Sequence, residues 1–504
     1  MRVLIPDTWH FHRRNFAALL DALRRNGVHT YIDRTGRRLW KTHGNYEAYR
    51  ALFAKWLSDL SNLAQSEVSH FEYQGINVFR CARSELMCKL LPLWDVQQRV
   101  GPNTDDNIIK RAWSDPQARE TLFLCMAAAC FWIDHWNKIQ QAHGPFSHAL
   151  VFSGSYIYTR ALQETASRSK TRIFTLEGFF TGHAFYLEER TTPIANNSLL
   201  GSESLLDRLT LPEDPVVLAR LRSEAHHRLA SMRNKNVRAD KNQLVPRPFK
   251  DRGAGTVIIV GQVMNDFSLI ESALPEASSI VFYRQLLTRL LTESAMTIVF
   301  KAHPWERKRY NLLAPVTLTQ MAAFMEQLAP HHRARVRLLE NEPIGAIFGH
   351  ADWIVGLCSQ GLLEACQAGF KPMQAGKAFF GRRGFTHDFE SADQVADALI
   401  ANELPPRLSL EEYRKFEDFL VKSLVLHLVS NSPRECDKAW KLISKPPGWS
   451  YPWQDADKQI TERPRPSIFA SLRSILLHPG AWIRLAWSSV PRISGRKYTM
   501  RKRR

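Results

Sequence analysis

The chain has 504 residues, of which 44% are hydrophobic and 23% are charged, the ordinary composition of a folded soluble protein. Its length exceeds what one hydrophobic core usually serves, so we expect two domains. The net charge of +19 indicates an anionic partner, such as nucleic acid, anionic lipid or a phosphorylated substrate. Seven cysteines without CxxC or Cys/His metal spacing argue against a secreted disulfide scaffold.

The opening stretch RVLIPDTWHFHRRNFAALLDALRRNGVHTYI predicts a strand, a helix and a second strand. Phe16, Leu19 and Leu23 recur at helical spacing, and Gly27 lies where a helix stop is expected. Such a βαβ unit is typical of a parallel sheet covered by helices. The apolar run before Asp7 is too short for a signal peptide, so we expect none.

The longest apolar stretch, TLFLCMAAACFWI, lies between Glu120 and Asp134. It is too short to span a bilayer, so we predict a buried helix and no transmembrane helix. A second strand-helix-strand unit follows in SHALVFSGSYIYTRALQETASRSKTRIFTLEGFF. The polar, basic stretch from Met232 to Gly255 has almost no apolar periodicity, and we place the interdomain linker there.

Beyond this linker, strands and helices alternate to about Ile400, through TVIIVG, MTIVFKAH, RVRLLE and DWIVGLC, and a helical segment SLEEYRKFEDFLVKSLVLHLV follows. Three of the strands end in polar clusters, after Val260, Phe300 and Cys358. Ligands of open parallel sheets bind just beyond the carboxyl ends of the strands. Each cluster alone could be a solvated loop, but three in succession predict one shared crevice.

The third cluster predicts a phosphate-binding helix start. Ser359 is the expected N-cap of the helix QGLLEACQAG, which ends at Gly369. The free N–H groups and the positive dipole end of such a helix suit a phosphate, and Gly361 would permit close approach. Glu364, one turn later, would reach a sugar hydroxyl. The alternative is an ordinary capped helix with a solvent-facing Glu.

The other two clusters supply cations and a carboxylate. Lys301 and His303 leave the second strand together and could stabilise the charge on a phosphate leaving group. Alternatively, His303 is a core histidine with satisfied nitrogens. Asp266, four residues after Gln262, could act as base, nucleophile or ligand of a sugar hydroxyl. It could equally cap the following turn together with Ser268.

In their order and spacing, GQVMNDFS, KAHPWE, GLCSQGLLEACQAGFKP and GKAFFGRRGFTHDF resemble the capsular polysaccharide biosynthesis proteins. That family includes the bacterial transferases of β-linked Kdo, an eight-carbon acidic sugar. The resemblance is good over residues 250–395, weaker over 1–200 and absent in the tail. The family's motifs fall on Gln262 and Asp266, on His303 and Pro304, on Ser359 and Glu364, on Gly384, Thr386 and Asp388, and, through TLEGFF, on Glu177.

This resemblance implies a GT-B architecture, in which two Rossmann-like domains enclose an active-site cleft. It also implies CMP-β-Kdo as the donor, no metal or other cofactor, and retention of anomeric configuration through a covalent intermediate. Asp266 would be the nucleophile, Glu177 the acid/base, and His303 with Lys301 would bind the CMP phosphate. The other implied donor-binding residues are Gln262, Ser359, Gln360, Gly361, Glu364, Thr386 and Asp388. The turn Cys358-Ser359-Gln360 departs from the consecutive Ser or Thr that family members more often carry, so contacts to the nucleotide could differ.

The predicted α/β chain has four parts. An acceptor-side Rossmann-like domain covers residues 1–240, and a nucleotide-sugar-binding domain covers 253–400. Closing helices cover 401–460, and a basic amphipathic tail covers 461–504.

The tail carries eleven Lys and Arg and one Glu, a net charge of 11 − 1 = +10, about half of the total. Ile468, Leu472, Ile475 and Leu476 have helical spacing, and Trp482 follows. Apolar insertion together with basic charge predicts contact with an anionic membrane surface, on the cytoplasmic face of the cytoplasmic membrane. The alternative is that the helix packs on the protein and the basic end is merely solvated.

The function predicted from these observations is a glycosyltransferase that builds bacterial surface polysaccharide on a lipid-linked or glycan acceptor. The second candidate is a phosphotransferase of the teichoic-acid polymerase kind, which uses a CDP-linked polyol in the same architecture. A nucleic-acid-binding protein is a third reading. Half of the excess charge lies in one tail beside aliphatic and Trp residues, and no nucleic-acid motif is present, so we expect no nucleic-acid partner.

Overall fold

A computed structural model describes residues 1–34, 46–94, 104–179, 182–194, 196–230, 254–271, 278–303, 306 and 315–462. The chain divides into two compact units, Met1–Trp453 and Gln454–Arg504. Of the second unit, residues 454–462 are described, and nearly all of them belong to α18 (Trp453–Thr461). The expected linker and the basic tail lie almost wholly outside the described residues, and the domain boundaries at residues 240 and 253 stay predictions.

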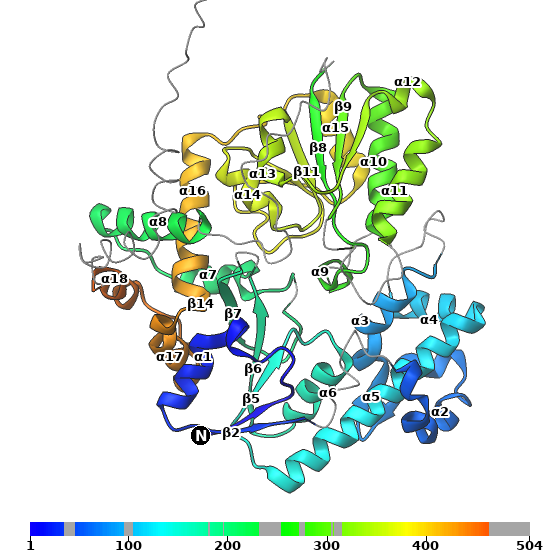
Figure 1. Ribbon diagram of the computed structural model, residues 1–504, viewed down its shortest axis with the longest axis vertical. Helices are drawn as coiled ribbons and strands as arrows, with labels where there is room; N and C mark the ends of the chain where they lie inside the picture. Colours follow the sequence, from blue (N-terminus) through cyan, green and yellow to red (C-terminus); the bar gives the residue numbers. More distant parts are fainter. Residues whose placement is uncertain are drawn as a thin grey trace, which may run out of the picture. The chain divides into compact units, whose positions relative to one another are not determined.

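The described residues of the first unit form two six-stranded sheets (Figure 1) and a two-stranded hairpin. In the part of the chain that the structure describes, the first sheet has the order β14-β7-β6-β5-β1-β2. Strands β2, β1, β5 and β6 are parallel, whereas β7 and β14 are antiparallel to their neighbours. The apolar runs of β1 and β5 suit strands that are covered on both faces. The strands are β1 (Arg2–Ile5), β2 (His29–Ile32), β5 (His148–Phe152), β6 (Arg172–Gly178), β7 (Ala184–Glu189) and β14 (Val429–Ser430).

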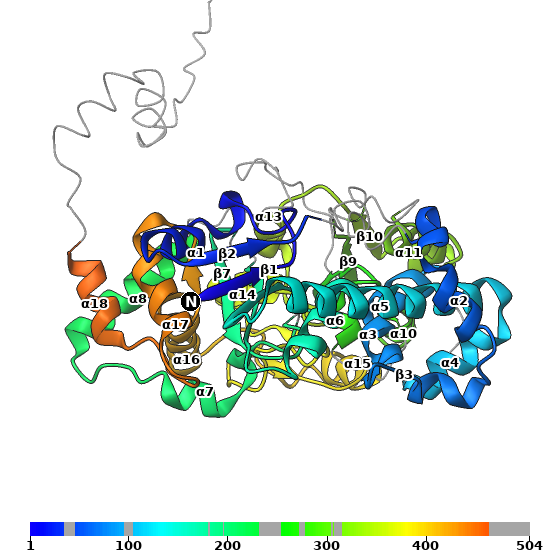
Figure 2. The same cartoon turned by 90° about the horizontal axis from the view of Figure 1, so that it is seen from below.

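The predicted strand-helix-strand start of the chain is confirmed, and so is the buried helix around TLFLCMAAACFWI, which is the centre of α5. Asp115 caps this helix by accepting a 3.0 Å hydrogen bond from the Gln117 N–H. Helix α5 packs on α3 and α6 (Figure 2). No helix that the structure describes is long and apolar enough to cross a membrane. The elements around this sheet are α1 (Arg13–Arg25), α2 (Ala54–Leu60), α3 (Val78–Leu90), α4 (Asp105–Ser114), α5 (Pro116–His143), α6 (Ile157–Ala166), α7 (Glu203–Arg208), α8 (Pro215–Ala230) and the hairpin β3 (Glu72–Tyr73) with β4 (Ile76–Asn77).

The second sheet is parallel throughout its described strands, in the order β10-β9-β8-β11-β12-β13. Four of these strands are the ones predicted from the apolar runs after the linker. The strands are β8 (Thr256–Val260), β9 (Thr297–Lys301), β10 (Val336–Leu339), β11 (Trp353–Gly356), β12 (Met373–Gln374) and β13 (His387–Asp388). The helices are α9 (Phe267–Glu271), α10 (Ser279–Glu293), α11 (Val316–Glu326), α12 (Pro330–Arg333), α13 (Ile344–Ile347), α14 (Gly361–Gln367) and α15 (Ala392–Ala401).

Each sheet has a topological switch point, where the chain reverses its direction across the sheet. In the second sheet the chain runs from β8 outward to β10 and then returns to the other side of β8 with β11. In the first sheet it runs from β1 to β2 and then returns to the other side of β1 with β5. Loops diverge at such points, and ligands of open α/β sheets bind in the crevice that they leave.

After the second sheet the chain returns to the first. Helix α16 (Leu410–Leu420) continues into a π-helical segment, Val421–His427, and β14 then pairs with β7, with Val429 opposite Phe185. The sequence predicted helix through Val429. In the structure the helical segment ends at His427. The Lys438 ammonium of α17 (Cys436–Ser444) donates hydrogen bonds of 2.7 Å to Val425 O and 2.5 Å to Leu428 O, and thereby satisfies carbonyls at this end.

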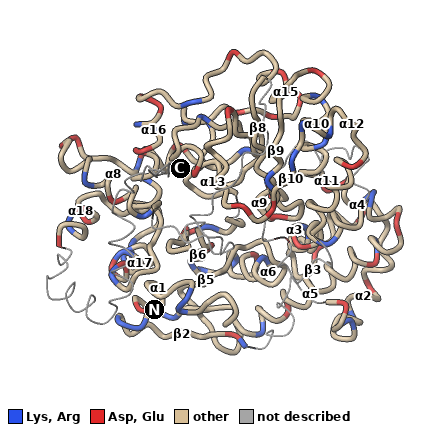
Figure 3. Tube along the Cα trace, turned by 45° about the horizontal axis from the view of Figure 1, so that its top comes forward, with Lys and Arg blue, Asp and Glu red and all other residues tan. Residues whose placement is uncertain are grey.

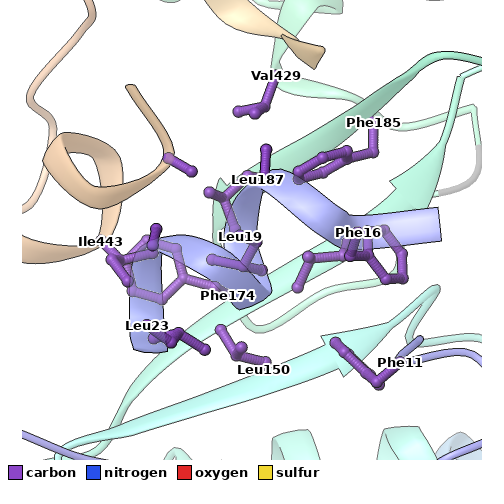
Figure 4. Close-up of a cluster of buried hydrophobic side chains, with 14 of the residues drawn as sticks. Phe11, Phe16, Leu19, Leu23, Leu150, Phe174, Phe185, Leu187, Val429 and Ile443 are labelled. Atoms are coloured by element: carbon purple, nitrogen blue, oxygen red, sulfur yellow. The ribbon is translucent and has the colours of Figure 1, made fainter. Parts of the chain in front are cut away.

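The return of the chain completes the core of the first sheet. Figure 4 shows Val429 and Ile443 in the same buried apolar cluster as Phe16 and Leu19 of α1. Helix α17 packs directly on α1. The last described segments of the first unit are therefore part of the first domain, although they follow the second domain in sequence.

Candidate functional site

The three polar clusters predicted at strand ends lie side by side in the structure. Val260 at the end of β8 pairs with Lys301 of β9 and with Gly356 of β11, so the carboxyl ends of these strands are aligned. Gln262 bridges the first and third clusters, because its Oε1 accepts a 3.3 Å hydrogen bond from the Cys358 N–H. The predicted convergence of the strand ends is therefore confirmed, and the bridge lies at the switch point of the second sheet.

Gln262 and Asp266 are connected through Ser268. The Gln262 Nε2 donates to Ser268 Oγ over 2.7 Å, and Ser268 Oγ donates to Asp266 Oδ1 over 2.8 Å. The Ser268 N–H also donates to Asp266 Oδ1, over 2.9 Å, so Asp266 caps α9. This is the structural role that the sequence left open. The other oxygen, Oδ2, accepts no hydrogen bond from a described residue, and the carboxylate is half-buried.

The loop that carries Asp266 rests on the first domain (Figure 1). The Asn265 side chain is buried and donates a 3.2 Å hydrogen bond to Cys88 O in α3, while Cys88 Sγ donates to Asn265 O over 3.2 Å. At the other end of α9, Glu271 Oε1 accepts from Ser84 Oγ of α3 over 2.5 Å and from Ser155 Oγ, after β5, over 3.1 Å. Both ends of this short helix are thus attached to the first domain.

Lys301 does not point freely into the crevice. Its side chain is 5% exposed, and its ammonium donates hydrogen bonds to Ala302 O over 2.8 Å and Glu340 O over 2.9 Å. Burial lowers the pKa of this ammonium to about 8, against the opposing charges of Glu342 and Glu340. Lys301 therefore ties the end of β9 to the end of β10.

His303 follows two residues later and is half-buried. The next described residue, Glu306, donates its N–H to His303 O over 3.3 Å. Its buried carboxylate accepts from the Thr317 N–H over 2.9 Å and the Leu318 N–H over 3.2 Å. The acidic residue of KAHPWE thus caps α11 and holds the loop that presents His303.

The third cluster opens α14, but the predicted N-cap is wrong: the helix begins at Gly361, one residue later than expected, and Gln360 holds the N-cap position without a capping side-chain hydrogen bond. Ser359 Oγ accepts a 3.3 Å hydrogen bond from the Gly361 N–H, and Gly369 ends the turn after the helix with a φ of +81°. Ser359, Gln360, Gly361 and Glu364 are all half-buried. These four residues therefore lie at the same carboxyl edge as Gln262.

Thr386 and Asp388 are brought together, but at the edge of the sheet. Thr386 Oγ1 donates to Asp388 Oδ2 over 3.0 Å, and Gln374 Nε2 donates to Asp388 Oδ1 over 2.5 Å. Gln374 Oε1 in turn accepts from the Ala378 N–H over 3.0 Å. The network holds the turn after β12, and β13 is separated from β8 by β12 and β11. No described hydrogen bond joins this pair to Asp266.

Glu177 lies on the other domain, at the carboxyl end of β6, where it pairs with Tyr186 of β7. It is half-buried. The neighbouring strand β5 is followed by Ser155, which holds Glu271 of α9. Glu177 and the Asp266 loop are therefore associated with the same edge of the first sheet.

Sequence reasoning missed a cluster at this edge, formed by Asp7, His10 and Tyr158. Tyr158 Oη lies 2.8 Å from Asp7 Oδ2 and 3.0 Å from His10 Nδ1. The signal was present, because PDTWH is a polar group directly after the apolar strand β1, the same pattern that predicted the polar clusters of the second domain.

A cavity of about 620 Å³ lies away from these residues. It surrounds the amino-terminal start of β6 and the end of antiparallel β7, the opposite edge of the first sheet. Its principal charges are already paired: Arg172 with Glu189 over 2.7 Å, and Arg190 with Glu188 over 2.8 Å. We therefore do not place the candidate active site in this cavity.

Two Rossmann-like domains, joined at the carboxyl edges of their sheets by the loop that carries Asp266, define a protein of the GT-B fold, as predicted. Residues 218–404 match the model of the capsule polysaccharide biosynthesis protein family. The match agrees with the motifs, and it includes every second-domain residue discussed above.

Similar solved structures include two from Thermosulfurimonas dismutans. The KpsC β-Kdo 2,4 transferase is 16% identical over 56% of this chain and 81% of that chain, with a TM-score of 0.35. The KpsC β-Kdo 2,7 transferase is 17% identical over 65% and 88%, with a TM-score of 0.37. An α,α-trehalose 6-phosphate synthase from Burkholderia multivorans is 11% identical over 88% and 98%, with a TM-score of 0.30. At TM-scores this low, the similarities carry no argument about this chain. No match is found among curated proteins.

Proposed function

We propose that the protein is a glycosyltransferase of bacterial surface polysaccharide biosynthesis, which transfers a sugar from a nucleotide donor to a lipid-linked or glycan acceptor. One observation carries the proposal. Asp266, at the switch point of a parallel sheet in a capsule-biosynthesis domain, keeps one carboxylate oxygen free of described partners and rests against the other domain. The donor that the motifs imply is CMP-β-Kdo.

The chemistry that we propose takes two displacements with retention. Asp266 attacks the anomeric carbon, and the bond from that carbon to the phosphate oxygen breaks with its electrons going to CMP. The acceptor oxygen then displaces the Asp266 carboxylate, and Glu177 takes the acceptor proton. A carboxylate beside an oxocarbenium-like centre is the usual means of such catalysis.

The leaving phosphate would lie between His303 and the start of α14. The N–H groups near Gly361 and a protonated His303 can stabilise the developing charge. Because the Lys301 ammonium is directed to Ala302 O and Glu340 O, we assign it the role of holding the His303 loop. Gln262 orients Asp266 through Ser268, and Thr386 with Asp388 shapes the far edge of the donor site. The proposal requires no metal.

The test is a donor screen that measures nucleotide release from CMP-Kdo, CDP-glycerol and UDP-hexoses, with wild type and Asp266→Asn. We expect release from CMP-Kdo and a fall by orders of magnitude in the variant, because the substitution keeps the shape and the cap acceptor but removes the charge. Near-normal turnover by Asp266→Asn would disprove the nucleophile role. Release from CDP-glycerol alone would identify the teichoic-acid type of phosphotransferase instead.

We further propose that the protein works at the inner face of the cytoplasmic membrane, held there by residues 461–504. Lys and Arg are interspersed with Asp and Glu along the described trace (Figure 3), whereas these residues carry +10 of the +19 net charge. Basic charge beside Leu, Ile and Trp residues is the combination that holds proteins on anionic bilayers.

A further inference from the structure

The switch point of the first sheet contains a buried carboxylate with a fixed set of donors. Asp7 follows β1 and is fully buried. Its Oδ1 accepts a 2.6 Å hydrogen bond from the His10 N–H, and its Oδ2 lies 2.8 Å from Tyr158 Oη and 3.4 Å from His10 Nδ1. Tyr158 belongs to α6, which follows β5, so the cluster joins the two strands that flank the switch point.

The proton positions in this cluster follow from its charges. Burial alone would raise the pKa of the Asp7 carboxyl, but the hydrogen bonds from His10 and Tyr158 hold that pKa below its usual value. Burial raises the pKa of the Tyr158 phenol well above its usual value. An ionised Asp7 can only accept, so the Tyr158 hydroxyl donates to it and accepts from His10 Nδ1–H over 3.0 Å. In neutral His10, Nε2 is then the nitrogen with the lone pair.

The His10 ring is held in place while this nitrogen stays available. The ring stacks on Phe152 with centroids 4.0 Å apart and an interplanar angle of 6°. The His10 side chain is 12% exposed, and its Nε2 makes no hydrogen bond to a described residue. The Tyr156 ring is a second aromatic neighbour, with its centroid 5.6 Å from that of His10, so aromatic rings border the imidazole. A fixed acceptor beside aromatic rings is suited to a hydroxyl-rich ligand.

The imidazole lies on the side of the first domain that receives α9. The Tyr156 ring is 5.6 Å from the His10 ring and 5.0 Å from the ring of Phe267, the residue directly after Asp266. One aromatic residue thus connects the switch point of the first sheet with the catalytic loop of the second. A sugar bound at His10 would be a neighbour of a donor sugar at Asp266.

We propose that His10 is an acceptor-binding residue. Its Nε2 accepts a hydrogen bond from a hydroxyl group of the acceptor glycan that is adjacent to the hydroxyl group that reacts. This rests on the proposed glycosyltransferase function and adds no second base, because the proton of the reacting hydroxyl still goes to Glu177. Asp7 and Tyr158 are positioning residues, which fix the tautomer and the orientation of the imidazole. The ligand class is a glycoside with free hydroxyl groups.

The test compares wild type with His10→Phe, which keeps an aromatic ring on Phe152 and removes both ring nitrogens, Nε2 and Nδ1. The acceptors are a panel of soluble octyl glycosides, and the donor is the one that wild type turns over. We expect the KM for the acceptor to rise by about 3- to 10-fold, the loss of one hydrogen bond, while the KM for the donor and donor hydrolysis without acceptor stay unchanged. His12→Phe, two residues away and outside the cluster, is the matched control and should leave all three unchanged.

An acceptor KM within the error of wild type, or a parallel change in the donor KM, overturns the proposal. Wild type that hydrolyses the donor but glycosylates no octyl glycoside overturns the ligand class. Wild type that releases nucleotide from no donor overturns the proposed function, and this inference with it. Nitrogen-15 NMR of wild type tests the geometry without any variant: Nδ1 should carry the proton, and the best acceptor should shift Nε2, whereas an unshifted Nε2 contradicts the contact.

Discussion

Asp266 comes four residues after Gln262, at the position where the chain caps the start of α9. Gln262 reaches Ser268 from the end of β8, and Ser268 fixes one oxygen of Asp266. The Gln262–Asp266 motif therefore has a structural role besides its proposed chemistry, because Gln262 orients the Asp266 carboxylate from within the same domain. A cap and a nucleophile are compatible because a carboxylate has two oxygens, and one of them suffices for the cap.

The lowered pKa of Lys301 predicts a specific dependence of the free energy of unfolding on pH. Its pKa is lowered to about 8 by burial, whereas an unfolded Lys titrates near 10.4. Between these values the unfolded chain binds a proton that the folded chain does not, so Lys301 makes the free energy of unfolding rise with pH, by at most about 1.4 kcal/mol per pH unit. Urea unfolding of wild type and Lys301→Met should show a difference that grows in favour of wild type from pH 8 to about 10.5. Lys170→Met, at an exposed position, is the control, and parallel curves for wild type and Lys301→Met would contradict the assignment.

At the residue scale, the sequence located the polar cluster at the strand ends of the second domain and missed the polar cluster of the first. Asp266, His303 and Ser359 each follow an apolar strand, which a local pattern can show. The link between His10 and Tyr158 spans 148 positions and exists only because β5 is placed beside β1. The direction of the Lys301 side chain was equally beyond local reasoning, since its partner Glu340 directly follows β10.

The turn after β12 controls the start of α14. A Cβ added to Gly376 would lie 2.5 Å from Leu357 C and 2.6 Å from Cys358 N, both backbone atoms that precede the Ser359 turn. Gly376→Ala should therefore lower the free energy of unfolding by about 1–3 kcal/mol and weaken donor binding, as measured by denaturant titration and calorimetry with CMP. Gly345→Ala in α13 is the matched control, because nothing lies within 4 Å of its added Cβ. Equal behaviour of the two variants would refute this packing argument.

Elements with strong local patterns were predicted well, and the others were not. Apolar spacing revealed α1 and α5, and uninterrupted apolar runs revealed β8 and β9. Strand β14 has two residues, too few for any period, and its pairing with β7 is decided by tertiary packing. The sequence therefore extended the preceding helix through Val429, and only the structure shows the chain crossing back to the first sheet.

At the scale of the whole molecule, the proposed membrane attachment can be separated from catalysis. A variant truncated after Asp457 should retain donor turnover and transfer to a soluble glycoside, because the residues of the proposed site lie between residues 1 and 404. It should lose sedimentation with anionic liposomes, since it lacks the tail's net charge of +10 and its apolar residues. Zwitterionic liposomes are the control, and neither protein should sediment with them. Equal partitioning of both proteins on anionic liposomes would show that attachment lies elsewhere.

The return of the chain to the first sheet has a consequence during synthesis. Strand β7 ends at Glu189, but β14 and α17, which complete its edge and cover α1, end at Ser444. At a translation rate of about 5–20 residues per second, roughly 13–50 s pass between the synthesis of β7 and that of α17. During this time the apolar surface around Phe16 and Phe185 is not yet covered by β14 and α17. During that interval the second domain can form on its own, because its six strands are consecutive in the chain. The nascent first domain is therefore the part that would engage chaperones and would be the more easily cut by proteases on the ribosome.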